Sequence, residues 1–347
     1  MVPEPRLLAL KTAVPHHVLE QHVVADIART LFGGKTDIER MLPVFENSGI
    51  AFRHSCVPAD WYLGDHGWRD RNAVFIENAV ALLENVAHAC LAEASLAPDE
   101  IDAVVSVTTT GIATPSLDAL IAEQMNLRRD IARLPIFGFG CAGGVLGLAR
   151  AGTLAKASPG TNVLLLCVEL CALTFRKDDV SKSNIVATAL FGDGAAGAIV
   201  STEGEGPSLG PSFEHTWKDS LGVMGWDIEE DGFKAVFSKS IPELVEEEFE
   251  EVLLDFLRRN RLKLDDIDAF ACHPGGAKVL SALERAFRLE NGGLKDSREI
   301  LRRYGNMSAV TVLFVLERMR IREKRQRTLL SSLGPGFTAA FMTLEGQ

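Results

Sequence analysis

Three short, glycine-rich segments of the sequence carry a thiol, an imidazole and a primary amide. Cys141 stands between an apolar run typical of a strand (residues 134–139) and one typical of a helix (residues 145–157). His273 lies in the run Cys-His-Pro-Gly-Gly, and Asn306 lies in Gly-Asn-Met-Ser-Ala. A nucleophile, a base and an amide donor are the side chains that thioester chemistry through an acyl-cysteine needs.

The position of Cys141 predicts how its thiol reacts. A helix N-terminus favours anions, so we expect the thiolate to be stabilised there, and further by a thiolate–imidazolium pair with His273. His273 and Asn306 could together hold a thioester carbonyl oxygen as it becomes an enolate. That ability favours decarboxylation of a malonyl thioester, whose carbanion would attack the acyl group on Cys141. Hydrolysis by a positioned water is the open alternative.

Each of these residues also has a purely structural explanation. A cysteine in such a turn is often a packing residue, and an asparagine at a helix start is often an N-cap. Residues 138–143 also match the Gly-x-Gly-x-x-Gly pattern of dinucleotide sites, but a clear acidic partner about 20 residues downstream is missing. The conjunction of Cys141, His273 and Asn306 favours thioester chemistry.

The chain repeats itself weakly in three places, always in the same order. The matching pairs are residues 98–104 with 264–270, 140–143 with 305–308, and 192–199 with 334–341. Two copies of one α/β unit, related by a pseudo-twofold axis, would bring equivalent helix N-termini together. Cys141 and Asn306 occupy equivalent positions in the copies, and His273 ends a strand of the second. We therefore expect the three side chains to meet in one site.

The hydrophobic pattern predicts an α/β protein built from this internal duplication. The predicted strands cover residues 7–11, 103–107, 133–137, 163–168, 195–200, 269–272, 327–331 and 338–344. Residues 203–231, rich in Gly, Pro and charge, are interpreted as a crossover with surface hairpins. The first half, residues 1–205, would carry the nucleophile; the second, residues 206–347, would carry the catalytic His and Asn.

Composition excludes several classes of protein. The net charge of −11 argues against binding to nucleic acid or to an anionic membrane. The six cysteines form no Cys-x-x-Cys pair and no zinc spacing with histidine, so no metal is expected. Residues 1–6 do not resemble a signal peptide, and no apolar run approaches the roughly 20 residues of a membrane span. These features predict a cytoplasmic protein.

The motifs resemble those of the type III polyketide synthases, the chalcone and stilbene synthase-like family of the thiolase superfamily, in its bacterial form. The segments that carry the resemblance are 140–144, 273–276, 305–308 and 333–337, with looser matches at 8–15 and 47–53. The resemblance implies a thiolase-like five-layered αβαβα fold and a homodimer. It also implies iterative extension of an acyl-CoA starter with malonyl-CoA, without a bound cofactor.

The resemblance assigns roles to individual residues. Cys141 would carry the starter and the growing chain, while His273 and Asn306 would promote decarboxylation. Phe191 resembles a gatekeeper between the coenzyme A tunnel and the cavity, and Arg53 a basic residue at the tunnel mouth. Residues that match the cavity wall or the coenzyme A site are Thr110, Cys171, Thr174, Ser308 and Gly276.

One departure from the family pattern concerns the second gatekeeper. Ala235 stands where plant enzymes have a second phenylalanine. This replacement predicts a more open cavity that suits a bulky or long-chain starter. Two alternatives stay open: a ketoacyl synthase III-like enzyme that condenses once, because it shares Cys141, His273 and Asn306, and a non-catalytic scaffold.

Overall fold

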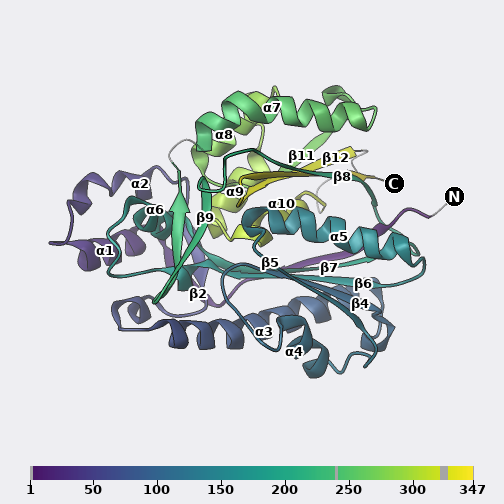
Figure 1. Cartoon of the computed structure of the whole chain (residues 1–347), viewed down its shortest axis with the longest axis horizontal. Coiled ribbons are helices and arrows are strands. Elements are labelled where there is room, and N and C mark those ends of the chain that lie inside the picture. Colours follow the sequence, from purple (N-terminus) through teal and green to yellow (C-terminus); the bar gives the residue numbers. More distant parts are fainter. Residues whose placement is uncertain (1–2, 239–240, 321–326, 347) are drawn as a thin grey trace.

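The computed structural model describes residues 3–238, 241–320 and 327–346; residues 1 and 2 of the N-terminal segment considered above lie outside this range. The chain folds into five layers of helices and strands, as predicted (Figure 1). Helices α3 (Trp68–Ala94) and α4 (Leu117–Gln124) cover one side, and α7 (Ile241–Arg259) and α8 (Ala277–Ala286) cover the other. The remaining helices are α1 (Gln21–Phe32), α2 (Pro43–Glu46), α5 (Gly143–Ala157), α6 (Lys182–Leu190), α9 (Lys295–Tyr304) and α10 (Thr311–Arg320).

Nine strands pair in the order β11-β12-β13-β8-β1-β7-β6-β4-β5, and two smaller pairs, β9–β10 and β2–β3, lie outside them. Strands of the first half are β1 (Arg6–Ala13), β2 (His17–Glu20), β3 (Phe52–Ser55), β4 (Ala103–Thr108), β5 (Ala132–Phe137), β6 (Val163–Leu170) and β7 (Asp193–Ser201). Strands of the second half are β8 (Ser208–Thr216), β9 (Met224–Glu229), β10 (Gly232–Phe237), β11 (Ala269–Cys272), β12 (Arg327–Gly334) and β13 (Thr338–Glu345).

The strand order confirms the internal duplication. Reading outward from the centre, β1-β7-β6-β4 in the first half corresponds to β8-β13-β12-β11 in the second, with the same parallel and antiparallel pairings. The repeated segments at Pro98–Glu100 and Leu264–Asp266 both form a single 3-10 turn before a strand. The halves are joined where Arg6 pairs with Ser208. The division at residue 205 stays a prediction.

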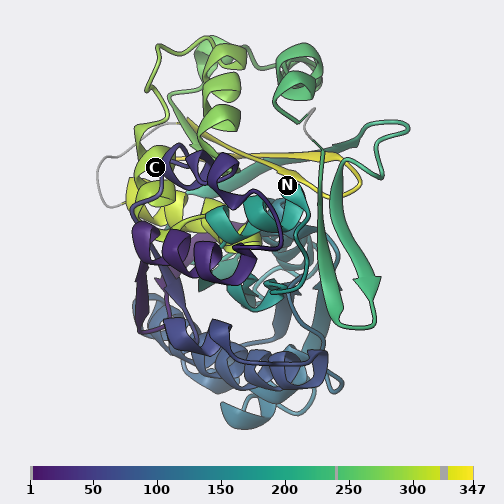
Figure 2. The same ribbon diagram turned by 90° about the vertical axis from the view of Figure 1, so that its left-hand side faces the viewer.

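All eight predicted strands are present, but the interpretation of residues 203–231 was partly wrong. Strand β8, inside that range, belongs to the central strand order beside β1 and β13. The sequence does not reveal this strand, because only Leu209 of its nine residues is buried and no alternating hydrophobic pattern develops. The hairpin β9–β10 is present as expected and stands at the side of the molecule, green in Figure 2.

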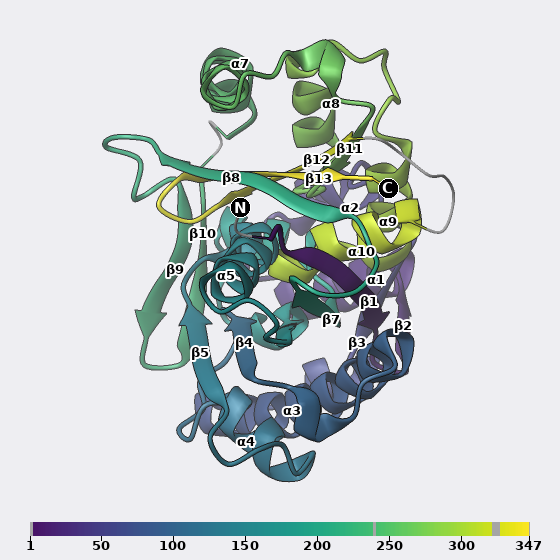
Figure 3. The same ribbon diagram turned by 90° about the vertical axis from the view of Figure 1, so that its right-hand side faces the viewer.

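Helices α5 and α10 form the central layer between the two halves of the strand order (Figures 1 and 3). Most residues of both helices are buried, and those of α5 are mainly glycine and alanine. Gly144 shows why: a Cβ there would lie 2.2 Å from the backbone oxygen of Ala309. Ala309 belongs to η7 (Ser308–Val310), the 3-10 turn that precedes α10. The absence of a side chain at Gly144 therefore lets the starts of the two helices touch.

Helix α3 is longer and more apolar than the expectation of no membrane-spanning segment assumed. By length and composition it could cross a membrane, the one such helix among the residues described. Core helices pass the same test, and α3 buries Phe75, Leu83 and Cys90 in the hydrophobic core.

Replacing Gly144 with Ala is expected to destabilise the protein by about 2–3 kcal/mol, because the clash is with backbone that no rotamer change relieves. Urea unfolding of the variant and the wild type measures the difference. Gly222→Ala is the matched control, since a Cβ there meets nothing within 4 Å. Equal stability of all three proteins would contradict the close packing of α5 on η7.

Candidate active site

Cys141 lies in η4 (Gly140–Ala142), a 3-10 turn that leads directly into α5. Gly140 has a φ of +49°, and a Cβ there would lie 2.5 Å from the ring of Pro335. The loop after β12 thus packs directly on the nucleophile turn. The prediction that Cys141 stands between a strand and a helix start is confirmed.

Asn306 approaches Cys141 from the second half of the chain. The Cys141 Sγ lies 4.0 Å from the Asn306 Oδ1, at the limit of a sulfur hydrogen bond. Asn306 is fixed by its backbone, which donates to Leu190 O (2.8 Å) and accepts from Gly192 N (3.1 Å). The Ser308 N–H donates to Asn306 Oδ1 at 2.8 Å, which orients the amide. Its Nδ2 is left available as a donor toward a substrate oxygen.

His273 follows the last residue of β11, as predicted, and its N–H donates to Ser331 O at 2.9 Å. The side chain is 4% exposed, and neither ring nitrogen has a hydrogen-bond partner among the described residues. Buried polar atoms without partners are rare in folded proteins and often mark functional positions. Here they suit an imidazole that exchanges protons with a bound substrate.

Burial determines the protonation of the site. It raises the pKa of the Cys141 thiol to about 12, against opposing hydrogen bonds from the Ser308 and Asn306 side chains. Burial alone lowers the pKa of His273 to about 3. Both shifts are caused by loss of hydration and oppose the expected thiolate–imidazolium pair, which stays a prediction.

The three residues line one cavity of about 810 Å³, which confirms that the duplication brings them together. Its walls come from both halves of the chain, including Leu190, Met224 and Phe237. The cavity has a mostly apolar wall and a few polar groups. This combination is typical of a site for a flexible, mostly apolar ligand. Gly276, predicted to contact coenzyme A, also lines this cavity, at the N-terminus of α8.

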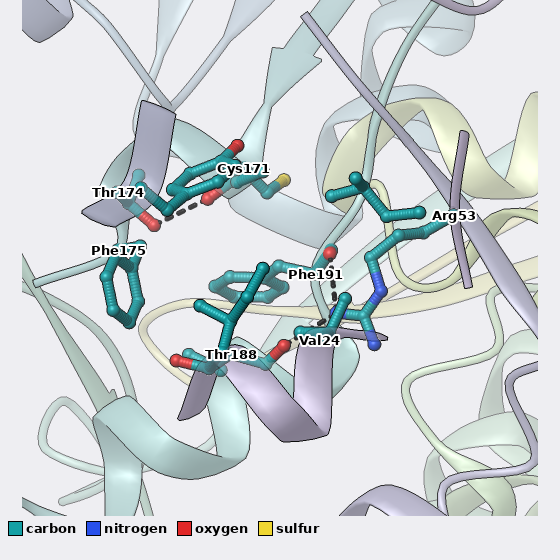
Figure 4. Close-up of a pocket in the computed structure, with 12 residues that line it drawn as sticks. Val24, Arg53, Cys171, Thr174, Phe175, Thr188 and Phe191 are labelled. Atoms are coloured by element: carbon teal, nitrogen blue, oxygen red, sulfur yellow. Dashed lines mark hydrogen bonds between the residues drawn. The ribbon is translucent and has the colours of Figure 1, made fainter. Parts of the chain in front are cut away.

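Phe191 lies beside a second, small cavity of about 40 Å³, together with Cys171 and Thr174 (Figure 4). The Phe191 ring centre lies 5.8 Å from that of Phe237, which lines the large cavity. Phe191 therefore stands between the two cavities. Its assigned role as a gatekeeper, and those of Cys171 and Thr174 as wall residues, stay predictions.

The expectation of a more open cavity next to Ala235 stays a prediction. Ala235 packs in a cluster with Phe191, and its cross-strand partner in the hairpin is Trp226. The rings of Trp226 and Phe237 lie 6.0 and 5.8 Å from that of Phe191. Two aromatic side chains of the β9–β10 hairpin thus pack against Phe191 in this region.

The prediction that Arg53 lies at the tunnel mouth is wrong. Arg53 is 2% exposed and lies below the surface, so it cannot stand at a tunnel mouth. Its guanidinium donates to the backbone oxygens of Thr188 (2.6 Å), Ala189 (2.8 Å) and Phe191 (3.0 Å), and to the Gln21 side chain. Arg53 thus holds the end of α6 and the backbone of Phe191 in place (Figure 4).

Glu169 was missed as a neighbour of the reactive thiol. It is fully buried near the end of β6, accepts hydrogen bonds from Thr109 N (2.9 Å) and Thr110 Oγ1 (2.8 Å), and interacts with Ser308. Burial raises its pKa to about 7, and its charge raises the pKa of Cys141. The sequence signal that could have identified Glu169 is an acidic residue inside an otherwise apolar strand. The cavity-wall roles predicted for Thr110 and Ser308 stay predictions.

A duplicated five-layered α/β fold with a cysteine, a histidine and an asparagine in one cavity defines a thiolase-like acyltransferase. Comparison with known families identifies it further. The family model for the N-terminal domain of chalcone and stilbene synthases matches residues 62–204, and that for the C-terminal domain matches residues 214–346. The chain belongs to this family and is a type III polyketide synthase.

Several relatives are similar over nearly their whole length. The putative chalcone synthase of Bacillus subtilis (strain 168) is 34% identical, over 97% of both chains. The 1,3,6,8-tetrahydroxynaphthalene synthase of Streptomyces peucetius subsp. caesius is 36% identical, over 97% of this chain and 92% of the relative. The crystal structure of the corresponding enzyme from Streptomyces coelicolor A3(2), a bacterial type III polyketide synthase, matches with a TM-score of 0.94 at 28% identity over 99% of each chain.

Replacing Glu169 with Gln is expected to stabilise the protein by about 3 kcal/mol at pH 8 and by little at pH 4. A carboxyl whose pKa is raised from 4.5 to about 7 on folding costs stability as the pH rises through this window, because the folded protein must then bury its charge. Chemical denaturation at both pH values measures the effect. An equal change in stability at pH 4 and pH 8 would show that Glu169 does not titrate in this window.

Proposed function

We propose that this enzyme loads an acyl-CoA starter onto Cys141, extends it repeatedly with malonyl-CoA and cyclises the product. A pyrone, a resorcinol and a phloroglucinol-type compound are the product classes we expect. The observation that carries the proposal is that Cys141, His273 and Asn306 line one cavity of about 810 Å³. A cavity of this size holds a chain of several ketide units next to the thiol.

The loading step uses the neutral thiol–imidazole pair. Cys141 attacks the thioester carbonyl and its proton passes to His273, whose ring nitrogens have no other partner among the described residues. The tetrahedral intermediate then expels coenzyme A, which leaves as its thiol when it takes that proton. Because one thioester replaces another, the step needs no external energy source.

The extension step uses His273 and Asn306 as hydrogen-bond donors. When the malonyl carboxylate leaves as carbon dioxide, its electron pair forms an enolate whose oxygen accepts hydrogen bonds from Asn306 Nδ2 and a His273 N–H. The enolate carbon attacks the acyl carbonyl on Cys141, a carbon–carbon bond forms and the cysteine sulfur is released. Transfer of the lengthened chain back to Cys141 permits another cycle.

Two lysines offer a site for the phosphates of coenzyme A, in place of Arg53. Lys182, at the start of α6, and Lys278, in the first turn of α8, both line the cavity. Neither forms an ion pair with another described residue. The N-terminus of α8 at Gly276 adds backbone N–H groups of the kind that favour anions.

The names of the relatives bear on the product. Two of them are 1,3,6,8-tetrahydroxynaphthalene synthases, and membership of the family favours repeated extension over the single condensation of a ketoacyl synthase III-like enzyme. Incubation with malonyl-CoA and a panel of acyl-CoA starters, followed by mass spectrometry of the products, tests the proposal. We expect multiply extended cyclic products; only singly extended ones would contradict it.

We further propose that the enzyme is a cytoplasmic homodimer. The edge strand β5 is largely exposed and carries Phe137, which is 51% exposed, beside Leu134. An exposed edge strand is a template for pairing with another chain, which supports a contact between two copies at this edge. All six cysteines are free, as expected in a reducing compartment.

Replacing Cys141 with Ala is expected to abolish acyl loading, because no other described thiol lines the cavity, while His273→Ala should slow malonyl-CoA decarboxylation by about 100-fold. Intact-protein mass spectrometry measures loading, and release of labelled carbon dioxide measures decarboxylation. Product formation by Cys141→Ala, or an unchanged decarboxylation rate in His273→Ala, would exclude the role assigned to that residue.

Removing Lys182 and Lys278 together is expected to raise the KM for malonyl-CoA about tenfold with little change in kcat, because the lysines would contact coenzyme A far from the reacting atoms. Steady-state kinetics of Lys182→Ala/Lys278→Ala measures both constants. Lys218→Ala, an exposed lysine paired with Asp219, is the control. An unchanged KM would place the coenzyme A phosphates elsewhere.

A further inference from the structure

The end of helix α6 presents four consecutive backbone oxygens, and one buried guanidinium binds three of them. Arg53 donates to the oxygens of Thr188 at 2.6 Å and Phe191 at 3.0 Å (Figure 4), and to that of Ala189 at 2.8 Å. The remaining oxygen, that of Leu190, accepts the Asn306 N–H at 2.8 Å. The last carbonyls of a helix have no partners within the helix and attract cations. Arg53 and Asn306 therefore share one row of acceptors.

Asn306 is tied to the same segment a second time. Its backbone oxygen accepts the Gly192 N–H at 3.1 Å, so that Phe191 and Asn306 form an isolated parallel bridge. The stem of Arg53 packs beside this bridge, because a Cβ at Gly192 would lie 3.2 Å, and one at Gly305 3.6 Å, from the Arg53 Cβ. Arg53 thus contacts the chain on both sides of the bridge that holds Asn306.

The hydrogen bonds of Arg53 are what make its burial possible. Its side chain is 2% exposed, and burial lowers its pKa to about 10, so the guanidinium stays charged at neutral pH. The charge of Asp193 favours the charged form, but no carboxylate of a described residue is hydrogen-bonded to Arg53. Its further partner is the Gln21 side chain, which itself donates to Ala189 O at 3.0 Å. A buried charge is costly unless hydrogen bonds compensate it, so these contacts hold the end of α6 firmly.

We propose that Arg53 is a positioning residue for Asn306. By fixing the end of α6, it sets the place from which the Asn306 amide meets the enolate oxygen. This inference rests on the proposed function, in which Asn306 acts in decarboxylation and extension but not in the loading of Cys141. Arg53 does not line the catalytic cavity. Its loss should therefore slow decarboxylation and spare loading, a split that a general loss of structure would not produce.

The rates of the two steps in Arg53→Met test the proposal. Release of labelled carbon dioxide from malonyl-CoA measures decarboxylation, and intact-protein mass spectrometry with an acyl-CoA starter alone measures loading. We expect the kcat of decarboxylation to fall about tenfold at an unchanged KM, because a small displacement of Asn306 weakens its hydrogen bond to the enolate. Loading should keep its wild-type rate. Equal slowing of both steps, or of neither, would overturn the proposal.

Two further variants keep this test decisive. Arg53→Lys keeps the charge but lacks the planar fork, so we expect decarboxylation to be about threefold slower than in the wild type. If Arg53→Met does not fold, wild-type decarboxylation by Arg53→Lys overturns the proposal. Arg71→Met is the matched control, since Arg71 is 7% exposed and donates to the backbone oxygens of Phe175 (2.9 Å) and Asp231. It should leave the ratio of decarboxylation to loading unchanged, and the same split in this control would overturn the proposal.

Hydrogen exchange tests the geometry without any substrate. In Arg53→Met the backbone amides of Asn306 and Gly192 should exchange about tenfold faster than in the wild type, because the segment to which they are bonded is loosened. Unchanged exchange at both amides in the folded variant would contradict a positioning role.

A double-mutant cycle separates this inference from the proposed function. In an Asn306→Ala background, Arg53→Met should slow decarboxylation no further, because Arg53 acts through the Asn306 amide. A full additional effect would overturn the proposal. If Asn306→Ala alone leaves decarboxylation unchanged, the role of Asn306 in the proposed function is wrong, and exchange at its backbone amide still decides whether Arg53 positions it.

Discussion

The contact between the start of α5 and the turn before α10 is the constraint on which the active site depends. Gly144 has no side chain, and this lets the backbone of Ala309 approach. The contact joins equivalent points of the two copies of the duplicated unit. Cys141 and Asn306 therefore come within 4.0 Å, although 165 residues separate them in sequence. His273 follows the last residue of strand β11 and lines the same cavity.

Burial is the second constraint, and it sets the chemistry of the site. Burial raises the pKa of the Cys141 thiol and lowers that of the His273 imidazole, so it favours the neutral form of both side chains. A neutral imidazole can accept the thiol proton at one nitrogen and donate a hydrogen bond from the other, which loading and decarboxylation need in turn. Hydrolysis by a positioned water stays the open alternative, because Cys141 lines a cavity of about 810 Å³ that has room for water.

The sequence predicted the elements that depend on local pattern. The eight strands, the repeated turns and the positions of Cys141, His273 and Asn306 all follow from periodicity, glycine placement and the internal repeat. Strand β8 was not predicted, because it is held by its neighbouring strands and has a single buried residue. The pKa shifts of Cys141 and His273 could not be predicted, because desolvation depends on residues brought together from both halves of the chain.

Predictions that relied on family resemblance alone were less secure for individual side chains. Arg53 stands at the sequence position that the resemblance assigned to the tunnel mouth. Its guanidinium instead binds the backbone at the end of α6. Ala235 lies in a cluster with Phe191, and its cross-strand partner is Trp226, so aromatic side chains surround the position that the resemblance assigned to a gatekeeper. The role of Arg53 is set by neighbours that are distant in sequence, the backbone oxygens of Thr188, Ala189 and Phe191.

The central claim is that one cavity both loads and extends the acyl chain on Cys141. The most direct measurement is acid-quenched, intact-protein mass spectrometry during turnover with malonyl-CoA and an accepted starter, followed by peptide mapping. We predict a series of adducts on Cys141 that grow by one ketide unit at a time. A starter adduct that never grows would contradict iterative extension on this thiol, and adducts mapped to another cysteine would contradict the site itself.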